Sequence, residues 1–465
     1  MSTVTVEKKM DQKIVWIFGL SEITALFLAG TGTSYFSYYI TNILMLSPAI
    51  MATVLLITRI FDIITILISS VVEEKMNLKW GKYRSWLLLM CPPAAVFGAL
   101  MYSGILSTAM ANCYLAAVCY VLMFGFFNFG RTAQLALLNA IGKTAEERAV
   151  LSARKGQFAS ANRIITSALY MPMIFFFSGG AGTVTAGGFW MAALVFDAAY
   201  ILSQMWLFAA TKNYDLPGAA VEAGKPKNSL TGKEMMEQVF KNPPLMIILI
   251  TETCKSIGPG LFNAYVIYYF TIVAQDLTVQ PIFQTTIAVF TLFGALIMGS
   301  FVRKKVGKKV AYSSGFLAYT IALVCARVFA SGNVTAFMII MGCGNFVYAG
   351  VTTTGPAMFG DCVEYGKYKI GKEGRAFIMG LYTLPIKIGT WVYGALSGVL
   401  LAWIGYDATI AITPELQAGM FNIITVAPSI VMGASFVLSL LYPLNESKVK
   451  EVMAENAARA AEQNI

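Results

Sequence analysis

The sequence predicts an all-α membrane protein with twelve transmembrane helices in two six-helix pseudo-repeats. Three observations support this fold class: the composition, the number of long apolar runs, and the charge of the loops between them. Of the 465 residues, 57% are hydrophobic and 12% are charged, whereas about 25% of an ordinary soluble domain is charged. The mean hydropathy is +0.67. This composition excludes a set of soluble domains and indicates a protein that crosses the membrane many times.

The apolar runs define the spans and the domains, because roughly 20 apolar residues cross a bilayer. The first six runs lie near 14–43, 48–72, 85–107, 111–141, 155–180 and 187–211. The second six lie near 243–275, 280–302, 310–331, 334–362, 376–404 and 416–443. We therefore expect four regions: an N-terminal bundle at 1–211, a cytoplasmic linker with a short amphipathic helix at 212–242, a C-terminal bundle at 243–444, and a cytoplasmic tail at 445–465.

The loops alternate in charge. Lysine and arginine gather in the predicted loops 73–84, 142–154, 303–309 and 363–375, and the intervening loops have neither. By the positive-inside rule both termini are cytoplasmic in a multi-pass membrane protein. The net charge of +10 comes from these short loops and does not indicate nucleic acid as a partner. The polar start of the chain leads directly into the first span, which predicts an anchor and not a signal peptide.

The reactive residues argue against an enzyme. The chain has no histidine and seven cysteines, six of them in apolar runs, with no CxxC pair. No HExxH sequence or nucleophile elbow occurs, so we expect no metal site, no disulfide framework and no cofactor apart from a coupling ion. Without histidine, any proton relay has to use carboxylates, lysine or tyrosine.

Two local patterns mark the division into halves. Residues 231–234 fit a capping box that opens a short helix ending at Phe240 within the linker. Basic glycine–lysine turns follow the second span of each half, at 80–83 and 306–309. Two parallel six-helix repeats resemble the major facilitator architecture.

Ionisable residues inside the predicted spans are the main functional candidates, because charge in a bilayer is costly and usually faces a partner or a water-filled path. Five are basic and three acidic, an excess of 5 − 3 = +2: Glu22, Arg59, Asp62, Arg131, Arg163, Glu252, Lys255 and Lys387.

Arg59 and Asp62 are spaced i, i+3 and can meet on one helix face. They form either a local ion pair that eases insertion or a cation or substrate site. Arg131, deep in the fourth span, needs an anionic partner, which could be Asp62, Glu22 or an anionic substrate.

Glu252 and Lys255 repeat the i, i+3 spacing in the seventh span. The nearby Gly258–Gly260 segment contains a proline and should break or bend the helix, either at a gating or binding region or as a packing kink. Lys387 follows Tyr382 and Thr383 with Pro385 between them, and we expect these residues to contact the substrate.

The residues at 59–62 and 80–84 resemble the second span and following loop of the glycoside–pentoside–hexuronide:cation symporters. The segments 361–368, 381–389 and 441–444 also resemble that family, so the similarity covers almost the whole chain. It implies a twelve-helix transporter that works by alternating access and couples sugar uptake to Na⁺, Li⁺ or H⁺, with Asp62 at the cation site. It also implies gating roles for the residues of two cytoplasmic loops: Gly81, Lys82, Arg84, Asp361 and Glu364.

The chain departs from the family pattern at the cation site. The second acid expected four residues after Asp62 is Ile66, and the aspartate of the fourth span aligns with Arg131. Sodium prefers several hard oxygen ligands, so we expect Na⁺ coupling to be weak or lost. Arg131 could instead neutralise Asp62 as a fixed charge. The residues of the galactoside pattern are also missing, at Leu26, Leu135 and Gly156.

The sequence thus predicts a monomeric secondary active transporter that imports a glycoside, pentoside or hexuronide. An anionic solute is favoured by the excess of positive charge, and Na⁺ or H⁺ is the coupling ion. The alternatives are a cation-independent facilitator of an anionic solute, in which Arg131 replaces the coupling cation, and a sensor that does not transport. The partners are the small-molecule solute and the lipid bilayer.

Overall fold

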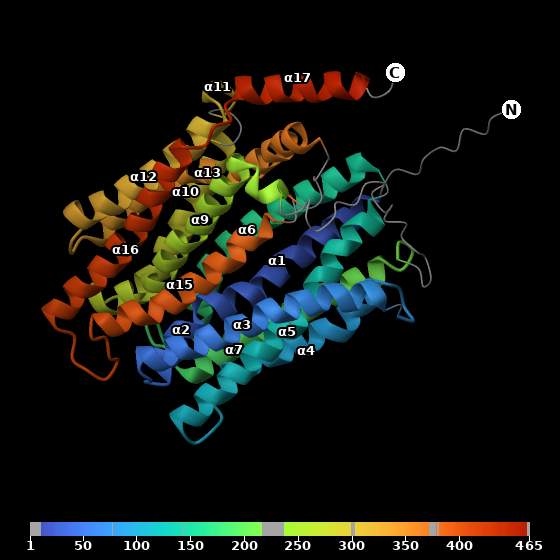
Figure 1. Ribbon diagram of the computed structural model, residues 1–465. Helices are drawn as coiled ribbons and strands as arrows, with labels where there is room; N and C mark the ends of the chain where they lie inside the picture. The colour runs from blue at the N-terminus through green and yellow to red at the C-terminus, as the bar shows by residue number, and fades with distance from the viewer. Residues whose placement is uncertain are drawn as a thin grey trace. The chain divides into compact units, whose positions relative to one another are not determined.

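The chain folds into helices that belong to two compact units. The structure, a computed structural model, describes residues 11–76, 78–142, 144–215, 237–298, 303–371, 378 and 381–462. The regular elements in these ranges are all helical (Figure 1). The first unit comprises Met1–Leu46 with Leu56–Val221, and the second Ser47–Leu55 with Glu222–Ile465. One boundary, after Val221, falls inside the predicted linker, whereas Ser47–Leu55 of the predicted N-terminal bundle belongs to the second unit.

The helices of the first unit follow the predicted spans closely. They are α1 (Gln12–Ser34), α2 (Phe36–Tyr38), the π-helix η1 (Tyr39–Ile43), α3 (Pro48–Lys75), α4 (Arg84–Leu100), α5 (Ala109–Ile141), α6 (Ala145–Phe177) and α7 (Ala186–Ala210). The first turns of α3, up to Leu55, belong to the second unit. Helix α1 packs against α6 and α7, and α4 packs against α5 and α7. Threonine side chains cap α5, α6 and α7, at Thr108, Thr144 and Thr185. Each satisfies a backbone N–H that has no partner within its helix.

The second unit has the same kind of construction. Its elements are α9 (Pro243–Tyr268), the π-helix η2 (Tyr269–Val273), the 3₁₀ helix η3 (Leu277–Val279), α10 (Gln280–Leu296), α11 (Arg303–Val306), α12 (Lys308–Phe329), α13 (Val334–Ile370), α15 (Thr383–Trp403), α16 (Pro414–Leu440) and α17 (Glu446–Glu462). Helix α9 packs against α15 and α16, α12 against α13 and α16, and α10 against α13.

The first helices of the two units repeat with an offset of 230 residues. In each unit the helix ends in a π-helix that begins with a buried tyrosine, Tyr39 or Tyr269. The carbonyl of each tyrosine accepts a hydrogen bond from the backbone N–H five residues on, at 2.9 Å and 3.0 Å. Each turn then contains a non-glycine residue with positive φ, Met45 at 54° and Gln275 at 53°. This uncommon conformation at matched positions supports the internal repeat that the sequence predicted.

The two basic turns are also built alike. Gly81 and Gly307 have φ values of 140° and 90°, in the region that favours glycine. A carboxylate that follows the last long helix of each unit accepts backbone N–H bonds from the turn. Asp215 accepts from the N–H groups of Lys82, Tyr83 and Arg84 at 2.7–3.2 Å, and Glu446 accepts from that of Lys308. A Cβ on either glycine would meet that carboxylate.

Ten helices among the described residues are long and apolar enough to cross a membrane. Helix α4 is apolar but shorter, at 17 residues, and α6 has 33 residues with charges in its first turns. These are the two remaining predicted spans. Most of the predicted tail at 445–465 forms helix α17, whereas the capping box at 231–234 lies outside the described residues.

Two predicted loop boundaries were wrong. Helix α13 continues to Ile370, so Glu364 lies on a helix and not in a loop at 363–375. Helix α6 begins at Ala145, so Arg148 and Arg154 are helical as well. Charged side chains at a helix end lower the mean hydropathy without ending the helix, which explains both errors. Helix α9 continues unbroken through Pro259.

Candidate functional site

A buried ion pair between α1 and α5 is the centre of the first unit. The Nη1 atom of Arg131 donates to Glu22 Oε2 at 2.5 Å, and its Nη2 atom donates to Oε1 at 2.8 Å. The exposed fraction of the side chain is 3% for Glu22 and 21% for Arg131. This two-bond geometry is the strong form of an arginine–carboxylate contact. We call Glu22, Arg131, Gln134 and Ser21 the N-unit cluster.

Neutral side chains hold the pair in place. Gln134, one turn after Arg131, accepts from its Nη1 at 3.0 Å and donates to Ser21 Oγ at 2.8 Å. Gln204 of α7 donates to the Ser21 carbonyl at 3.0 Å, and Asn162 of α6 donates to the Ile23 carbonyl at 2.9 Å. Helix α1 is therefore tied to α5, α6 and α7 around Glu22, which fixes the direction of its carboxylate.

Lys155 of α6 adds a second cation to this region. It is largely removed from solvent and interacts electrostatically with both Arg131 and Glu22. Two cations and one carboxylate give the region a net charge of 2 − 1 = +1. A negatively charged ligand would balance it.

The Arg59 and Asp62 side chains face α5 instead. Asn128 donates to Asp62 Oδ1 at 2.8 Å and to Thr65 Oγ1 at 2.9 Å. The Arg59 guanidinium lies 5.3 Å from the ring centre of Tyr120. The hydrogen bonds of Arg131 within the described residues go to Glu22 and Gln134. Of the partners that the sequence allowed, the structure selects Glu22, and it does not place Arg131 on Asp62 as a fixed charge.

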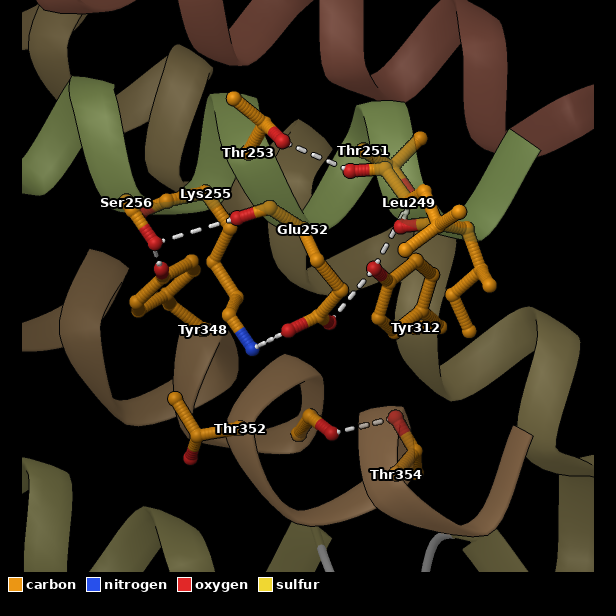
Figure 2. Close-up of polar contacts among 12 residues, drawn as sticks. Leu249, Thr251, Glu252, Thr253, Lys255, Ser256, Tyr312, Tyr348, Thr352 and Thr354 are labelled. Atoms are coloured by element: carbon orange, nitrogen blue, oxygen red, sulfur yellow. Dashed lines mark hydrogen bonds and ion pairs between the residues drawn. The ribbon is translucent and has the colours of Figure 1, made fainter. Parts of the chain in front are cut away.

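The second unit contains a related cluster, which Figure 2 shows. Glu252 of α9 is fully buried and forms an ion pair with Lys255 on the same helix. Its other oxygen accepts from the Tyr312 hydroxyl of α12 at 2.8 Å, and that hydroxyl also contacts Thr251 Oγ1 at 3.1 Å. We call Glu252, Lys255 and Tyr312, with Tyr348 and Tyr382 nearby, the C-unit cluster.

Pro259, where the sequence predicted a break or bend, has a local role here. Because Pro259 has no N–H, the Lys255 carbonyl loses its usual donor within the helix. The Tyr348 hydroxyl of α13 donates to that carbonyl at 3.4 Å. Gly355 of the same helix leaves room for the carboxylate, since a Cβ there would lie 2.6 Å from Glu252 Oε1. Helix α13 thus contacts the cluster at two points, the Lys255 carbonyl and the Glu252 carboxylate.

The other predicted residues lie in several places. The Lys255 ammonium is 6.0 Å from the Tyr382 ring centre, so these two predicted contacts belong together. Lys387 is half-buried on α15, and the Thr383 side chain lies outside the described part of the chain.

The predicted gating residues lie at turns and helix ends. Arg84 opens α4 and donates to the Phe208 carbonyl at 3.2 Å. Asp361 of α13 pairs with Lys308. The Glu364 carbonyl accepts from Asn456 of α17 at 3.0 Å. Arg163 is exposed on α6 and joins neither cluster.

Three residues were missed by the sequence analysis: Asp197, Lys155 as a member of the site, and the turn-binding Asp215. Asp197 is 3% exposed at the middle of α7. The signal was present, because it is an acid inside the predicted span 187–211. The apolar residues around it keep the mean hydropathy of the span high, so the hydropathy pattern does not reveal a single acid.

Solved structures with this arrangement of helices are transporters. The chain resembles a bacterial homologue of the human lysosomal transporter Spinster, with a TM-score of 0.68 and 12% identity over 96% of this chain and 98% of that one. It also resembles the nucleoside transporter NupG, with a TM-score of 0.65 and 13% identity over 93% and 98%. The chain therefore shares the fold of these two solved structures.

The sequence shows the family. The model of the MFS/sugar transport protein family matches residues 17–446, and the chain belongs to that family, so the protein is a transporter of the major facilitator type and not an enzyme. The glucuronide carrier protein homolog of Escherichia coli K12 is 23% identical over 96% of each chain. The isoprimeverose transporter of Lactiplantibacillus pentosus is 24% identical over 93% of this chain and 88% of its own. The resemblance to glycoside–pentoside–hexuronide:cation symporters is confirmed.

Proposed function

We propose that this protein imports an anionic sugar-type solute, such as a hexuronide, by alternating access across the bacterial cytoplasmic membrane. Helices α4 and α6 would add two spans to the ten apolar helices. Twelve spans and the basic loops imply that both termini are cytoplasmic. We expect the protein to work as a monomer with no cofactor other than its coupling ion.

The observation that carries this proposal is the charge of the N-unit cluster. Arg131 is held by Glu22 but keeps a partly exposed guanidinium, and Lys155 lies within electrostatic reach. A carboxylate or sulfonate on a sugar would supply the missing negative charge, and the amides nearby can bind hydroxyl groups. In the C-unit cluster the charges already balance.

The named substrates of relatives are compatible with this assignment without deciding it. A glucuronide is anionic and isoprimeverose is neutral, and the proteins named for them are similarly distant from this chain. The substrate class therefore rests on the cluster and not on the relatives.

Sodium coupling is disfavoured by the surroundings of Asp62. One of its oxygens already accepts an amide N–H of Asn128, and Ile66 supplies no second carboxylate. Since sodium prefers several oxygen ligands, we assign the coupling role to H⁺.

A cation-independent facilitator is the second candidate. It is favoured by the permanent charge of Arg131, which can balance an anionic solute without a coupling ion. Such a protein would equilibrate the solute but would not accumulate it.

Uptake by proteoliposomes tests the proposal. Radiolabelled methyl β-D-glucuronide should be taken up with little response to a Na⁺ gradient, and unlabelled methyl β-D-glucoside should compete poorly. Preference for the neutral glucoside would overturn the anionic assignment. Equilibration without accumulation under an inward H⁺ gradient would identify the facilitator, and absence of flux for both sugars would favour a sensor.

A further inference from the structure

The Asp197 carboxyl lies in an apolar interior. Its Oδ2 atom has no hydrogen-bond partner among the residues that the structure describes. A Cβ added to Gly98 of α4 would lie 2.9 Å from this atom and 2.7 Å from a methyl of Leu28. Phe196, the preceding residue, packs its ring edge-on against Phe27 of α1 at 4.7 Å. Asp197 therefore projects into a tightly packed region formed by α1, α4 and α7.

An ionised carboxylate in such a place would be strongly disfavoured. Burial of a charge is tolerated when a cation or several donors compensate it. Among the described residues Asp197 has no ion pair and its Oδ2 has no hydrogen-bond partner, whereas Glu22 accepts two hydrogen bonds from Arg131. Glu252 has both the Lys255 ammonium and the Tyr312 hydroxyl. The neutral acid is the form that fits this site.

The titratable groups that act on Asp197 are tyrosines. They are Tyr102, after the end of α4, Tyr170 of α6, and Tyr200, one turn further along α7. Helix α4 also presents Cys91, whose thiol shares a hydrogen bond with Tyr200. Tyrosine and cysteine are neutral at physiological pH, so none of these groups compensates a negative charge.

Tyr200 connects this acid to the N-unit cluster. It interacts electrostatically with both Asp197 and Arg131. A Cβ on Gly130, the neighbour of Arg131, would lie 3.4 Å from the Tyr200 hydroxyl. Gln204 follows one turn later and binds the Ser21 carbonyl. Asp197, Tyr200 and Gln204 thus follow the i, i+3, i+7 spacing of one helix face that leads toward Glu22 and Arg131.

We propose that Asp197 is the proton-carrying group of this transporter: it holds a proton in this structure and exchanges it with the region of the N-unit cluster during the transport cycle. The inference rests on the proposed function and names its coupling site. In the exchange the carboxylic O–H bond breaks, the proton passes to water or solute, and its return restores the neutral acid. No other reactant is required.

The charge of the solute links solute binding to the protonation of Asp197. An anion bound beside Arg131 adds negative charge near Tyr200 and Asp197, and this favours the protonated acid by simple electrostatics. By reciprocity the protonated acid favours the anion. Anion and proton therefore bind together, and one proton neutralises one negative charge on the solute.

Infrared difference spectroscopy tests the protonation without any solute. The spectrum of the purified wild-type protein at neutral pH should contain a carboxylic C=O band that shifts in D₂O and disappears in Asp197→Asn. Asp407→Asn is the matched control, because hydrogen bonds from Thr409 lower the pKa of the Asp407 carboxyl. The control should keep the band. If Asp197→Asn does not fold, Asp197→Glu should fold and shift the band. Absence of any band that depends on Asp197 would overturn the proposal.

Proton movement tests the role in coupling. Addition of methyl β-D-glucuronide to weakly buffered proteoliposomes should raise the external pH with wild-type protein. Asp197→Asn should abolish this signal and uphill accumulation but keep exchange of labelled for unlabelled glucuronide. Retained accumulation and alkalinisation in the variant would contradict the proposal. If the wild type exchanges glucuronide without alkalinisation, the proton role of Asp197 is wrong and the proposed function stands. If the wild type does not exchange glucuronide, the proposed function is wrong.

Discussion

Glu22 and Glu252 occupy the same place in the two units. They are 230 residues apart, the same offset as the two π-helices and the two positive-φ residues that follow them. Both carboxylates are buried and paired with a cation. The partners differ, because Arg131 comes from another helix and Lys255 lies one turn away on the same helix. The Glu22–Arg131 pair therefore joins two helices, whereas the Glu252–Lys255 pair lies within one helix.

Helices α7 and α16, at matched positions in the two units, also differ in their buried side chains. Thr185 and Thr413 cap α7 and α16, which aligns the helices with an offset of 228 residues. With this alignment Asp197, Tyr200 and Gln204 correspond to Thr425, Pro428 and Met432. Thr425 bonds within its own helix, and Met432 packs against Gly258. The comparison indicates that the two units repeat the cap of this helix, whereas the matched buried position has an acid in the first unit and a threonine in the second.

The largest expected effect comes from Arg131→Gln. It would leave the Glu22 carboxylate buried without its two-bond partner, and loss of one member of a buried pair typically costs about 3–5 kcal/mol. We expect a lower unfolding temperature and loss of preference for glucuronide over glucoside. The double variant Glu22→Gln, Arg131→Gln should recover stability without recovering the preference. Recovery of both would show that charge at this site does not select the solute.

Lys255→Gln is the matched change in the second unit. Tyr312 still donates to Glu252, and the new amide can donate as well, so we expect a smaller cost of about 2–3 kcal/mol. The ratio of glucuronide to glucoside affinity should stay as in the wild type. If Lys255→Gln changes this ratio as much as Arg131→Gln does, the N-unit cluster does not differ from the C-unit cluster in selecting the solute by charge.

The sequence predicted the ten long apolar helices and the buried charges of Glu22, Arg59, Asp62 and Glu252, because each of these leaves a local pattern. It could not choose between Glu22 and Asp62 as the partner of Arg131, since the choice depends on how α1, α3 and α5 pack. It also missed Asp197, because one acid barely changes the hydropathy of an apolar run. The repeat of Glu22 and Glu252 was visible only once the π-helices aligned the units.

Gly355→Ala tests how tightly the C-unit cluster is enclosed. The new methyl would lie 2.6 Å from Glu252 Oε1, and such overpacking costs about 1–3 kcal/mol. Gly125→Ala on α5 is the control, because a Cβ there makes an ordinary contact of 3.7 Å with Thr65. Thermal unfolding should separate the two variants. Equal stability would show that the carboxylate can move away freely.

The smallest effects are expected at the basic turns, where the units are most alike. Asp215→Asn weakens three backbone contacts, and Glu446→Gln weakens one. Hydrogen bonds to a charged group contribute about 1.5–3 kcal/mol in favourable cases. Because an amide oxygen still accepts, we expect about 1 kcal/mol for Asp215→Asn and less for Glu446→Gln. A larger loss for Glu446→Gln would reverse this order.

Isothermal titration calorimetry tests most directly whether the first unit selects the charge of the solute. Methyl β-D-glucuronide and methyl β-D-glucoside would be titrated into purified wild type, Arg131→Gln and Lys255→Gln. The account predicts tighter binding of the glucuronide to the wild type and to Lys255→Gln, and no preference in Arg131→Gln. A preference that persists without Arg131 and disappears without Lys255 would contradict it.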